Sequence, residues 1–238
     1  MGRRSGRKRS FRPGRFIVRA VAALLLFGLI GSAALVGLLR VANPPFTAMM
    51  LEQPMPLADQ RHDWRDREHI AASAAYAVIA AEDQRFLMHN GFDFASIEKA
   101  LEDYRAGEGL RGASTITQQV AKNLFLWPGR SFFRKGIEAY FTLLIEAFWP
   151  KERILEVYLN VAEFGTGVFG VEAASQEFFA TSAAELRPEQ AALLAAVLPN
   201  PKELRADRPS EYVRSRQAHI LGQMRTLRAH GHYGALAW

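Results

Sequence analysis

The sequence predicts an all-α protein in which one membrane-spanning helix precedes a helical domain. Three observations support this fold class. An uncharged apolar stretch near the N-terminus has the length of a transmembrane helix. The rest of the chain divides into helix-length stretches that glycine and proline separate. The long alternation of apolar and polar residues that is typical of a half-buried strand does not occur.

The predicted transmembrane helix covers residues 19–41, with the uncharged run 20–39 at its centre. About twenty apolar residues suffice for a helix to cross the hydrocarbon core. Residues 1–18 are rich in Arg and lack Asp and Glu, so the positive-inside rule predicts a cytoplasmic N-terminus and an exported domain. A cleaved signal peptide is the alternative. Its apolar region is normally only about 7–15 residues long and ends in a small-residue cleavage site, whereas the uncharged run 20–39 is longer and is followed directly by Arg40.

Composition limits the classes of function. The net charge of +6 comes mostly from the basic tail, so it gives no argument for nucleic acid, and we expect no nucleic-acid partner. The absence of Cys excludes a disulfide framework and a thiolate metal site. The exported domain, residues 68–238, is long enough for one ordinary hydrophobic core.

Along the chain, residues 42–67 contain four prolines and are interpreted as a linker or an extended arm over the domain. Residues 163–170 are predicted to form a glycine-rich loop. Helices are predicted at residues 68–81, 94–106, 114 or 115 to 124, 134–149, 151–160, 171–179, 188–197 and 209–230.

Glu82 is the first candidate catalytic residue. It follows the apolar run 74–81, so its carboxylate is partly desolvated and lies at the negative end of a helix dipole. Both effects raise the pKa, which suits a general base or acid near neutral pH. The alternative is a surface acid paired with Arg85, but the run from Phe86 through His89 to Asp93 favours a site. His89 and Asp93 either orient Glu82 or fix the turn.

Glu138 is the second candidate, because it shares a helical face with Arg134 and Lys135. The alternative is a local salt-bridge cluster. However, Arg before Glu is the less favourable order for such pairs, and the helix is otherwise mostly apolar. A charged triplet in that setting is more typical of a cleft wall.

A dense polar patch precedes this helix. Hydroxyl and amide groups hydrogen-bond sugar hydroxyls and phosphate oxygens, and cationic side chains add charge-assisted contacts. Helix capping accounts for some of the hydroxyls but not for their density. The candidates are Ser114, Thr115, Thr117, Gln118, Gln119, Lys122 and, beyond them, Arg130.

Residues 124–135 alternate large apolar side chains with basic ones around a Pro-Gly turn. Core packing accounts for some of them. Because the domain is tethered close to a bilayer, we expect this loop to enter the membrane interface, with aromatic rings inserted and cations at the headgroups. A lipid-linked substrate then reaches the cleft from the membrane. The scattered histidines contain no His-Glu-x-x-His pattern, so the sequence predicts no protein metal site.

Five motifs, in order, resemble those of the peptidoglycan glycosyltransferases (family 51), and within it the monofunctional biosynthetic transglycosylases. The resemblance covers nearly the whole exported domain and is specific. The motifs are Glu82-Asp83 with Phe86, His89 and Gly91; Gly112-x-Ser-Thr-Ile-Thr-Gln-Gln119; Arg134-Lys135-x-x-Glu138; the run 151–160 ending in Asn160; and the run 190–195 ahead of Pro199.

The resemblance implies a two-lobed lysozyme-like fold and polymerisation of lipid II with release of undecaprenyl pyrophosphate. It implies that Glu82 deprotonates the acceptor 4-hydroxyl. Glu138 would support the leaving pyrophosphate, directly or through a divalent cation such as Mg²⁺ or Mn²⁺; no other cofactor is expected. The implied substrate-binding residues are Asp83, Phe86, His89, Ser114, Thr115, Gln118, Gln119, Lys122, Arg130, Arg134, Lys135 and Asn160.

The same resemblance, together with the predicted span, implies a single-pass enzyme of the bacterial inner membrane with a periplasmic catalytic domain. Its expected partners are lipid II, the growing glycan strand, the membrane, and proteins of the divisome or elongation machinery. The chain ends too soon for a transpeptidase domain, so strand extension without cross-linking is expected. Two alternatives stay open: a lytic lysozyme-like enzyme, which has little use for the cationic cluster, and a non-catalytic membrane-anchored scaffold.

Overall fold

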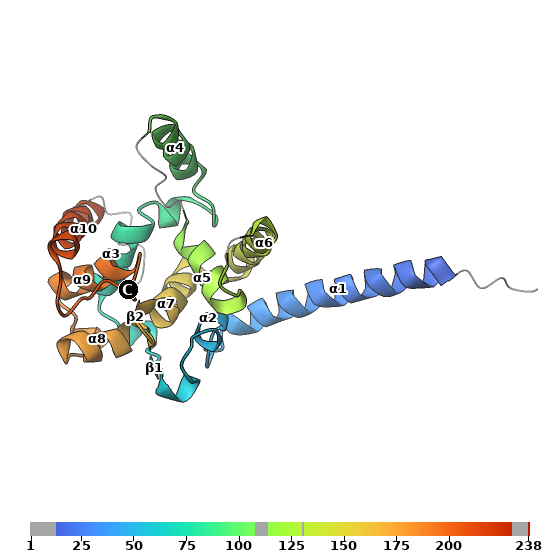
Figure 1. The fold of residues 1–238 in the computed structure, drawn as a ribbon, viewed down its shortest axis with the longest axis horizontal. Coiled ribbons are helices and arrows are strands. Elements are labelled where there is room, and N and C mark those ends of the chain that lie inside the picture. The colour runs from blue at the N-terminus through green and yellow to red at the C-terminus, as the bar shows by residue number, and fades with distance from the viewer. Residues whose placement is uncertain (1–12, 108–113, 130, 230–237) are drawn as a thin grey trace, which may run out of the picture.

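The computed structural model describes residues 13–107, 114–129, 131–229 and 238, and these are mostly helical (Figure 1). The predicted all-α class is therefore confirmed. The helices of the described part are α1 (Pro13–Leu39), α2 (Ala48–Leu51), α3 (Ala72–Glu82), α4 (Phe94–Arg105), α5 (Ile116–Phe125), α6 (Phe132–Phe148), α7 (Lys151–Val161), α8 (Val171–Phe179), α9 (Pro188–Val197) and α10 (Glu211–Ala229).

The helices pack as two groups that share one core. In the first group α3, α9 and α10 contact one another, and in the second α5 packs on α6 and α7. Helix α3 is buried on nearly all sides because alanines let its neighbours approach closely. Helix α4 stands apart from both groups (Figure 1). A hydrogen bond between Gln119 on α5 and Glu82 on α3 joins the two groups.

Three very short strands form the only sheet in the described residues, in the order β1-β3-β2. β1 (Arg61–His62) runs parallel to β3 (Val168–Phe169), and β2 (Glu163–Gly165) pairs with β3 in antiparallel fashion. The prediction of a simple loop at 163–170 was wrong, because strands of two or three residues are too short to show an alternating pattern. At Gly170 (φ +83°) an added Cβ would lie 2.7 Å from the Asn160 carbonyl oxygen, so glycine lets β3 turn into α8.

The predicted helix boundaries mostly agree with the structure, with one larger difference. The helix predicted to start at residue 68 begins at Ala72, because Arg67–His69 form a separate 3₁₀ turn. The Ala71 N–H that follows this turn donates to the Ala183 carbonyl. Residues 42–67 contain α2, a 3₁₀ turn at Leu57–Asp59 and β1, and the Met50 side chain is buried against the domain.

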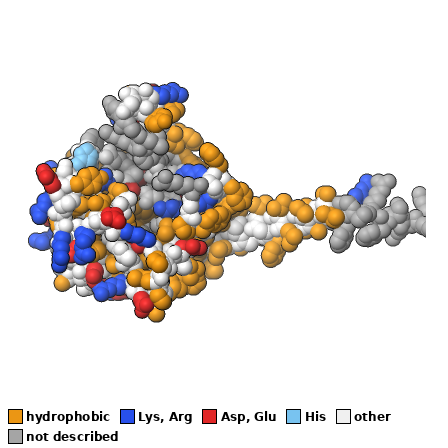
Figure 2. All heavy atoms as spheres, viewed as in Figure 1, with side chains coloured by type: hydrophobic (Ala, Val, Ile, Leu, Met, Phe, Trp, Pro, Cys, Tyr) orange, Lys and Arg blue, Asp and Glu red, His pale blue; other side chains and the backbone are white. Residues whose placement is uncertain are grey.

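Helix α1 projects from the domain as a long arm (Figure 1). Within the described residues, Ile17–Leu39 is the one helix long and apolar enough to cross a membrane. Figure 2 shows apolar side chains along this arm and on the adjoining side of the domain, whereas most charged side chains in view lie away from it. The end of α1 nearest the domain packs on α6. This arrangement is consistent with a single-pass membrane anchor.

Candidate functional site

Glu82 is the last residue of α3, and its side chain is only 16% exposed. The Gln119 Nε2 donates a hydrogen bond to Glu82 Oε2 at 2.9 Å. The Tyr158 hydroxyl in turn donates to Gln119 Oε1 at 3.2 Å, which fixes the orientation of the amide. On the other side, an Arg216 guanidinium nitrogen lies 4.0 Å from Glu82 Oε1. Side chains from α5, α7 and α10 thus hold one carboxylate in place.

The environment of Glu82 suits a general base, because it raises the pKa of the carboxyl group above its ordinary value. Burial raises the pKa of its carboxyl group, while the hydrogen bond from Gln119 and the charges of Arg216 and Lys122 partly oppose this effect. The predicted raising of the pKa is therefore supported, with burial as its main cause. Neighbouring residues Ala80 to Arg85, with Ser114 and Thr115, line a cavity at this point.

Glu138 forms the second part of the site. Its side chain is buried on α6, Arg134 donates to its Oε2 at 3.0 Å, and the Lys135 ammonium contacts its Oε1. Both carboxylate oxygens are therefore paired with cations. The Arg134 Nε is buried and has no hydrogen-bond partner within the described residues. The predicted face of three charged residues is present, and two of its members, Arg134 and Glu138, are largely desolvated.

Lys122 connects the two parts of the site. It lies on α5, three residues after Gln119 and on the same side of the helix. Burial lowers the pKa of its ammonium group, the charges of Glu138 and Glu82 raise it, and those of Arg134 and Lys135 lower it. Because one carboxylate from each part, Glu82 and Glu138, influences the pKa of Lys122, the two parts belong to one electrostatic site.

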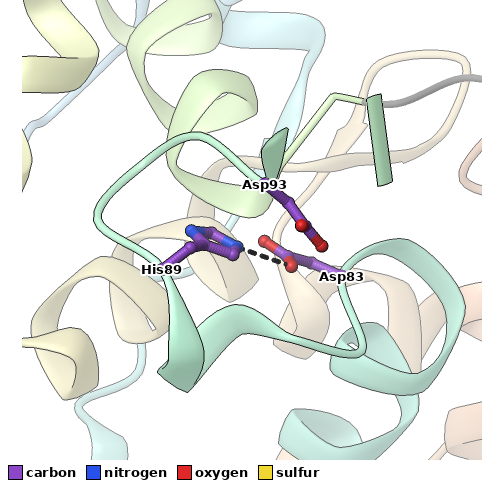
Figure 3. A group of neighbouring side chains, drawn as sticks. All are labelled: Asp83, His89 and Asp93. Atoms are coloured by element: carbon purple, nitrogen blue, oxygen red, sulfur yellow. Dashed lines mark hydrogen bonds and ion pairs between the residues drawn. The ribbon is translucent and has the colours of Figure 1, made fainter. Parts of the chain in front are cut away.

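Asp83, His89 and Asp93 lie together beside this site (Figure 3). Asp83 Oδ1 shares a hydrogen bond with His89 Nε2 at 2.8 Å, and its Oδ2 accepts the Ile116 N–H at 3.0 Å. Burial raises the pKa of Asp93, but hydrogen bonds from Ser96 together with the charges of Arg85 and His89 outweigh it, so the net pKa is lowered. Of the two roles left open for His89 and Asp93, the contacts favour fixing the turn, since neither bonds to Glu82.

The potential ligand atoms of Asp83, His89 and Asp93 lie within 4.8 Å of one another, close enough to be considered for a metal ion. Each carboxylate is nevertheless engaged on both oxygens, Asp83 by His89 and a backbone N–H, and Asp93 by Ser96. The buried His89 Nδ1, which has no partner in the described part of the chain, points away from the two carboxylates (Figure 3). These contacts fit a structural turn better than a metal site.

Several predicted substrate-binding residues are instead occupied within the fold. Thr115 and Gln118 form a capping box at the start of α5, and the Thr115 hydroxyl also donates to the Gly91 carbonyl at 2.7 Å. Phe86 is fully buried, with the Lys151 ammonium 4.5 Å from its ring centroid. These contacts give the side chains positions within the fold, and Asp83 and Thr115 also line the cavity; direct contacts of Asp83, Phe86, Thr115 and Gln118 with substrate stay predictions.

Asn160 is likewise engaged within the fold. It is fully buried, its Nδ2 donates to the carbonyls of Arg65 and Glu156, and its Oδ1 accepts the Arg65 N–H at 2.8 Å. No atom is left to bind a sugar, so Asn160 joins α7 to the segment before α3. Of the remaining candidates, Ser114 is exposed and lines the cavity. Arg130 lies outside the described residues.

Two residues of the site were missed by sequence reasoning. Tyr158 lies in the run 151–160, but only its neighbour Asn160 was selected as a candidate. Arg216 lies on α10, one of several arginines on a polar helix, and no local pattern distinguished it. Only the packing of α10 against α3 brings it to Glu82.

Comparison with known proteins identifies the family. The family model described as Transglycosylase matches residues 49–225. The chain belongs to the transglycosylase family. Three relatives named "Biosynthetic peptidoglycan transglycosylase" are similar over most of their length: from Bdellovibrio bacteriovorus (53% identical, 88% of this chain and 85% of the relative), Shewanella oneidensis (51%, 86% and 90%) and Xanthomonas axonopodis pv. citri (50%, 91% and 90%).

This transglycosylase is therefore a peptidoglycan glycosyltransferase of cell wall synthesis with a lysozyme-like helical domain. The predicted family, fold class and enzymatic activity are confirmed. The activity also disfavours the two alternatives left open by the sequence, a lytic enzyme and a scaffold. Glycosyl transfer needs a base for the acceptor hydroxyl, and Glu82 has the environment of one.

The position of Arg216 generates a prediction for the pH dependence of the transglycosylase. Replacing Arg216 by Gln removes a positive charge beside Glu82, so the pKa of Glu82 rises further. A base works only when deprotonated, and the acidic limb of the kcat/KM profile should therefore move to higher pH by up to about 1 unit. Arg216→Lys keeps the charge and should shift the limb less. Identical acidic limbs in the Gln variant and the wild type would contradict this role.

Proposed function

We propose that this transglycosylase polymerises lipid II, the undecaprenyl-pyrophosphate-linked disaccharide-pentapeptide, and releases undecaprenyl pyrophosphate. The single observation that carries the proposal is the shared electrostatic site around Lys122. A buried base lies on one side of it and a cationic cluster on the other. A substrate with both a sugar hydroxyl and a pyrophosphate matches this pair of features.

Glu82 acts on the acceptor sugar. Its carboxylate takes the proton of the 4-hydroxyl as that oxygen attacks the anomeric carbon of the donor. The new glycosidic bond forms as the bond from the anomeric carbon to the pyrophosphate oxygen breaks, with inversion, and the electron pair leaves on the pyrophosphate. The hydrogen bond from Gln119 keeps one carboxylate oxygen fixed. The other oxygen, Glu82 Oε1, accepts no hydrogen bond from the described residues and takes the proton.

The cationic cluster acts on the leaving group. Lys122, Arg134 and Lys135 neutralise the negative charge that develops on the pyrophosphate. Glu138 holds two of these cations in place before the substrate arrives. A divalent cation at Glu138 stays a prediction. Because both Glu138 oxygens already contact cations, no step of the proposal is assigned to a metal.

The orientation in the membrane is part of the proposal. Basic residues without acidic ones precede the apolar helix, so the positive-inside rule favours a cytoplasmic N-terminus and a periplasmic domain in the bacterial inner membrane. Association with divisome or elongation proteins stays a prediction.

The loop before α6 and the start of that helix carry exposed aromatic side chains. Phe132 is 99% exposed, Phe133 73% and Trp127 45%. Exposed rings of this size are costly in water and favourable at a membrane interface. Since α6 also packs on α1, we propose that these rings enter the outer leaflet and bring the cleft to the lipid-linked substrate.

The function is tested with purified full-length protein and fluorescent lipid II. The wild type should form glycan polymer, and Glu82→Gln should form it at least 100-fold more slowly, because the amide cannot accept the proton. Glu189→Gln, the same change at an exposed glutamate of α9, serves as the control and should retain full activity. Polymer formation by Glu82→Gln at the wild-type rate would contradict the assignment of the base.

Membrane insertion of the loop is tested by spin labelling, which is direct because the chain has no Cys. A nitroxide at Phe133→Cys in liposomes should be accessible to lipid-soluble oxygen and protected from a water-soluble nickel complex. A nitroxide at Ala218→Cys, on the exposed side of α10, should show the reverse. Equal accessibility to the nickel complex at both positions would rule out insertion.

A further inference from the structure

Arg153, on α7, makes an unusual set of contacts with the C-terminal end of α1. The last carbonyls of a helix have no partner within that helix. The Arg153 Nε and one terminal nitrogen both donate to the Leu39 carbonyl, at 3.2 and 3.0 Å, and that nitrogen also donates to the Ala42 carbonyl at 2.8 Å. A domain arginine therefore caps the membrane helix.

The surroundings of Arg153 hold its guanidinium in one position. The other terminal nitrogen donates to Asn43 Oδ1 at 2.9 Å and to Glu156 Oε2 at 3.0 Å. The rings of Trp64 and Trp149 lie 5.4 and 5.9 Å from the guanidinium carbon. The side chain is only 10% exposed. A buried, planar cation at the negative end of a helix dipole is strongly favoured, and lysine cannot reproduce its fork of donors.

Two further contacts fix α1 above this cap. The Trp149 indole Nε1 donates to the Val36 carbonyl at 2.7 Å, and the Val36 side chain is fully buried. One turn earlier, the Ser32 and Tyr140 hydroxyls share a hydrogen bond of 2.7 Å. Side chains of α6, of α7 and of the turn between them thus contact α1 at three positions along its length. Three such contacts fix the angle of α1 to the domain as well as its point of attachment.

Helix α7 also supports the catalytic base. Tyr158, five residues after Arg153, bonds to Gln119, which bonds to Glu82. One short helix therefore contacts both the end of the membrane anchor and the residues around the base.

We propose that Arg153 is a positioning residue, which fixes the membrane helix at one angle to the catalytic domain so that the cleft stays aligned with a substrate held in the bilayer. The proposal rests on the proposed use of a lipid-linked substrate. A domain that turned freely on residues 40–43 would present its cleft to the membrane only part of the time. The loss of Arg153 therefore lowers the rate for a substrate in the bilayer, and it leaves the reaction of a dissolved substrate unchanged.

The angle is measured first, by a readout that does not depend on activity. Nitroxides at Leu24→Cys, exposed on α1, and at Ala218→Cys, on α10, report the distance between anchor and domain in liposomes. We expect a narrow distance distribution in the otherwise unchanged protein and a broad one after Arg153→Gln. Arg205→Gln, the same change at an exposed arginine paired with Asp207, is the matched control and should stay narrow.

Activity is measured second, with two donors. Arg153→Gln should slow polymerisation of lipid II in liposomes about tenfold. It should change polymerisation of a short-chain, water-soluble analogue in detergent by less than about twofold. A folding defect would lower both rates, whereas the loss of positioning lowers only the first.

If Arg153→Gln fails to fold, Trp149→Phe replaces it, because this change removes the donor to the Val36 carbonyl and keeps an aromatic ring. A folded variant of either kind with the narrow distribution and the wild-type rate in liposomes overturns the proposal. Failure of the proposed function looks different: the wild type would then make no polymer from either donor, while the distance measurement would still stand.

Discussion

The spacing of Gln119 and Lys122 on α5 is the constraint on which the site depends. Three residues apart, they lie on one face of the helix, and the first holds Glu82 while the second is influenced by both Glu82 and Glu138. The N-terminus of α5 is itself fixed by the Thr115–Gln118 capping box and by Asp83, which accepts the Ile116 N–H. A shift of α5 would therefore disturb the base and the cationic cluster together.

The burial of charged side chains explains why the site contains so many ion pairs and hydrogen bonds. Glu138 and Arg134 are largely buried, and a buried charge without a partner is costly. Their mutual pairing offsets this cost and keeps the cations in place before any phosphate arrives. Lys122 is different: burial lowers its pKa, and two carboxylates oppose the effect. An approaching pyrophosphate adds negative charge to this side, which favours the charged form of the lysine.

The sequence predicted what depends on local pattern. Apolar runs, together with the glycines and prolines between them, located nearly every helix. Glu82 and Glu138 were selected as candidates because each lies in an apolar stretch of the sequence. Five residues were predicted to bind substrate because they lie in family motifs: Asp83, Phe86, Thr115, Gln118 and Asn160. Such motifs contain residues that build a site as well as residues that contact its ligand. The contact of Arg216 with Glu82 and the pairing of β1 with β3 join segments distant in the chain, and β2 and β3 are too short to show an alternating pattern, so no local signal predicted them.

The most direct test of a single shared site is the titration of Lys122, followed by NMR of a ¹³C-labelled side chain. The charges of Glu82 and Glu138 both raise the pKa of this lysine, so we expect Glu82→Gln and Glu138→Gln each to lower its titration midpoint. Glu189→Gln should leave the midpoint unchanged. If either of the first two substitutions also leaves it unchanged, the base and the cationic cluster do not share one site, and the assignment of their joint role is wrong.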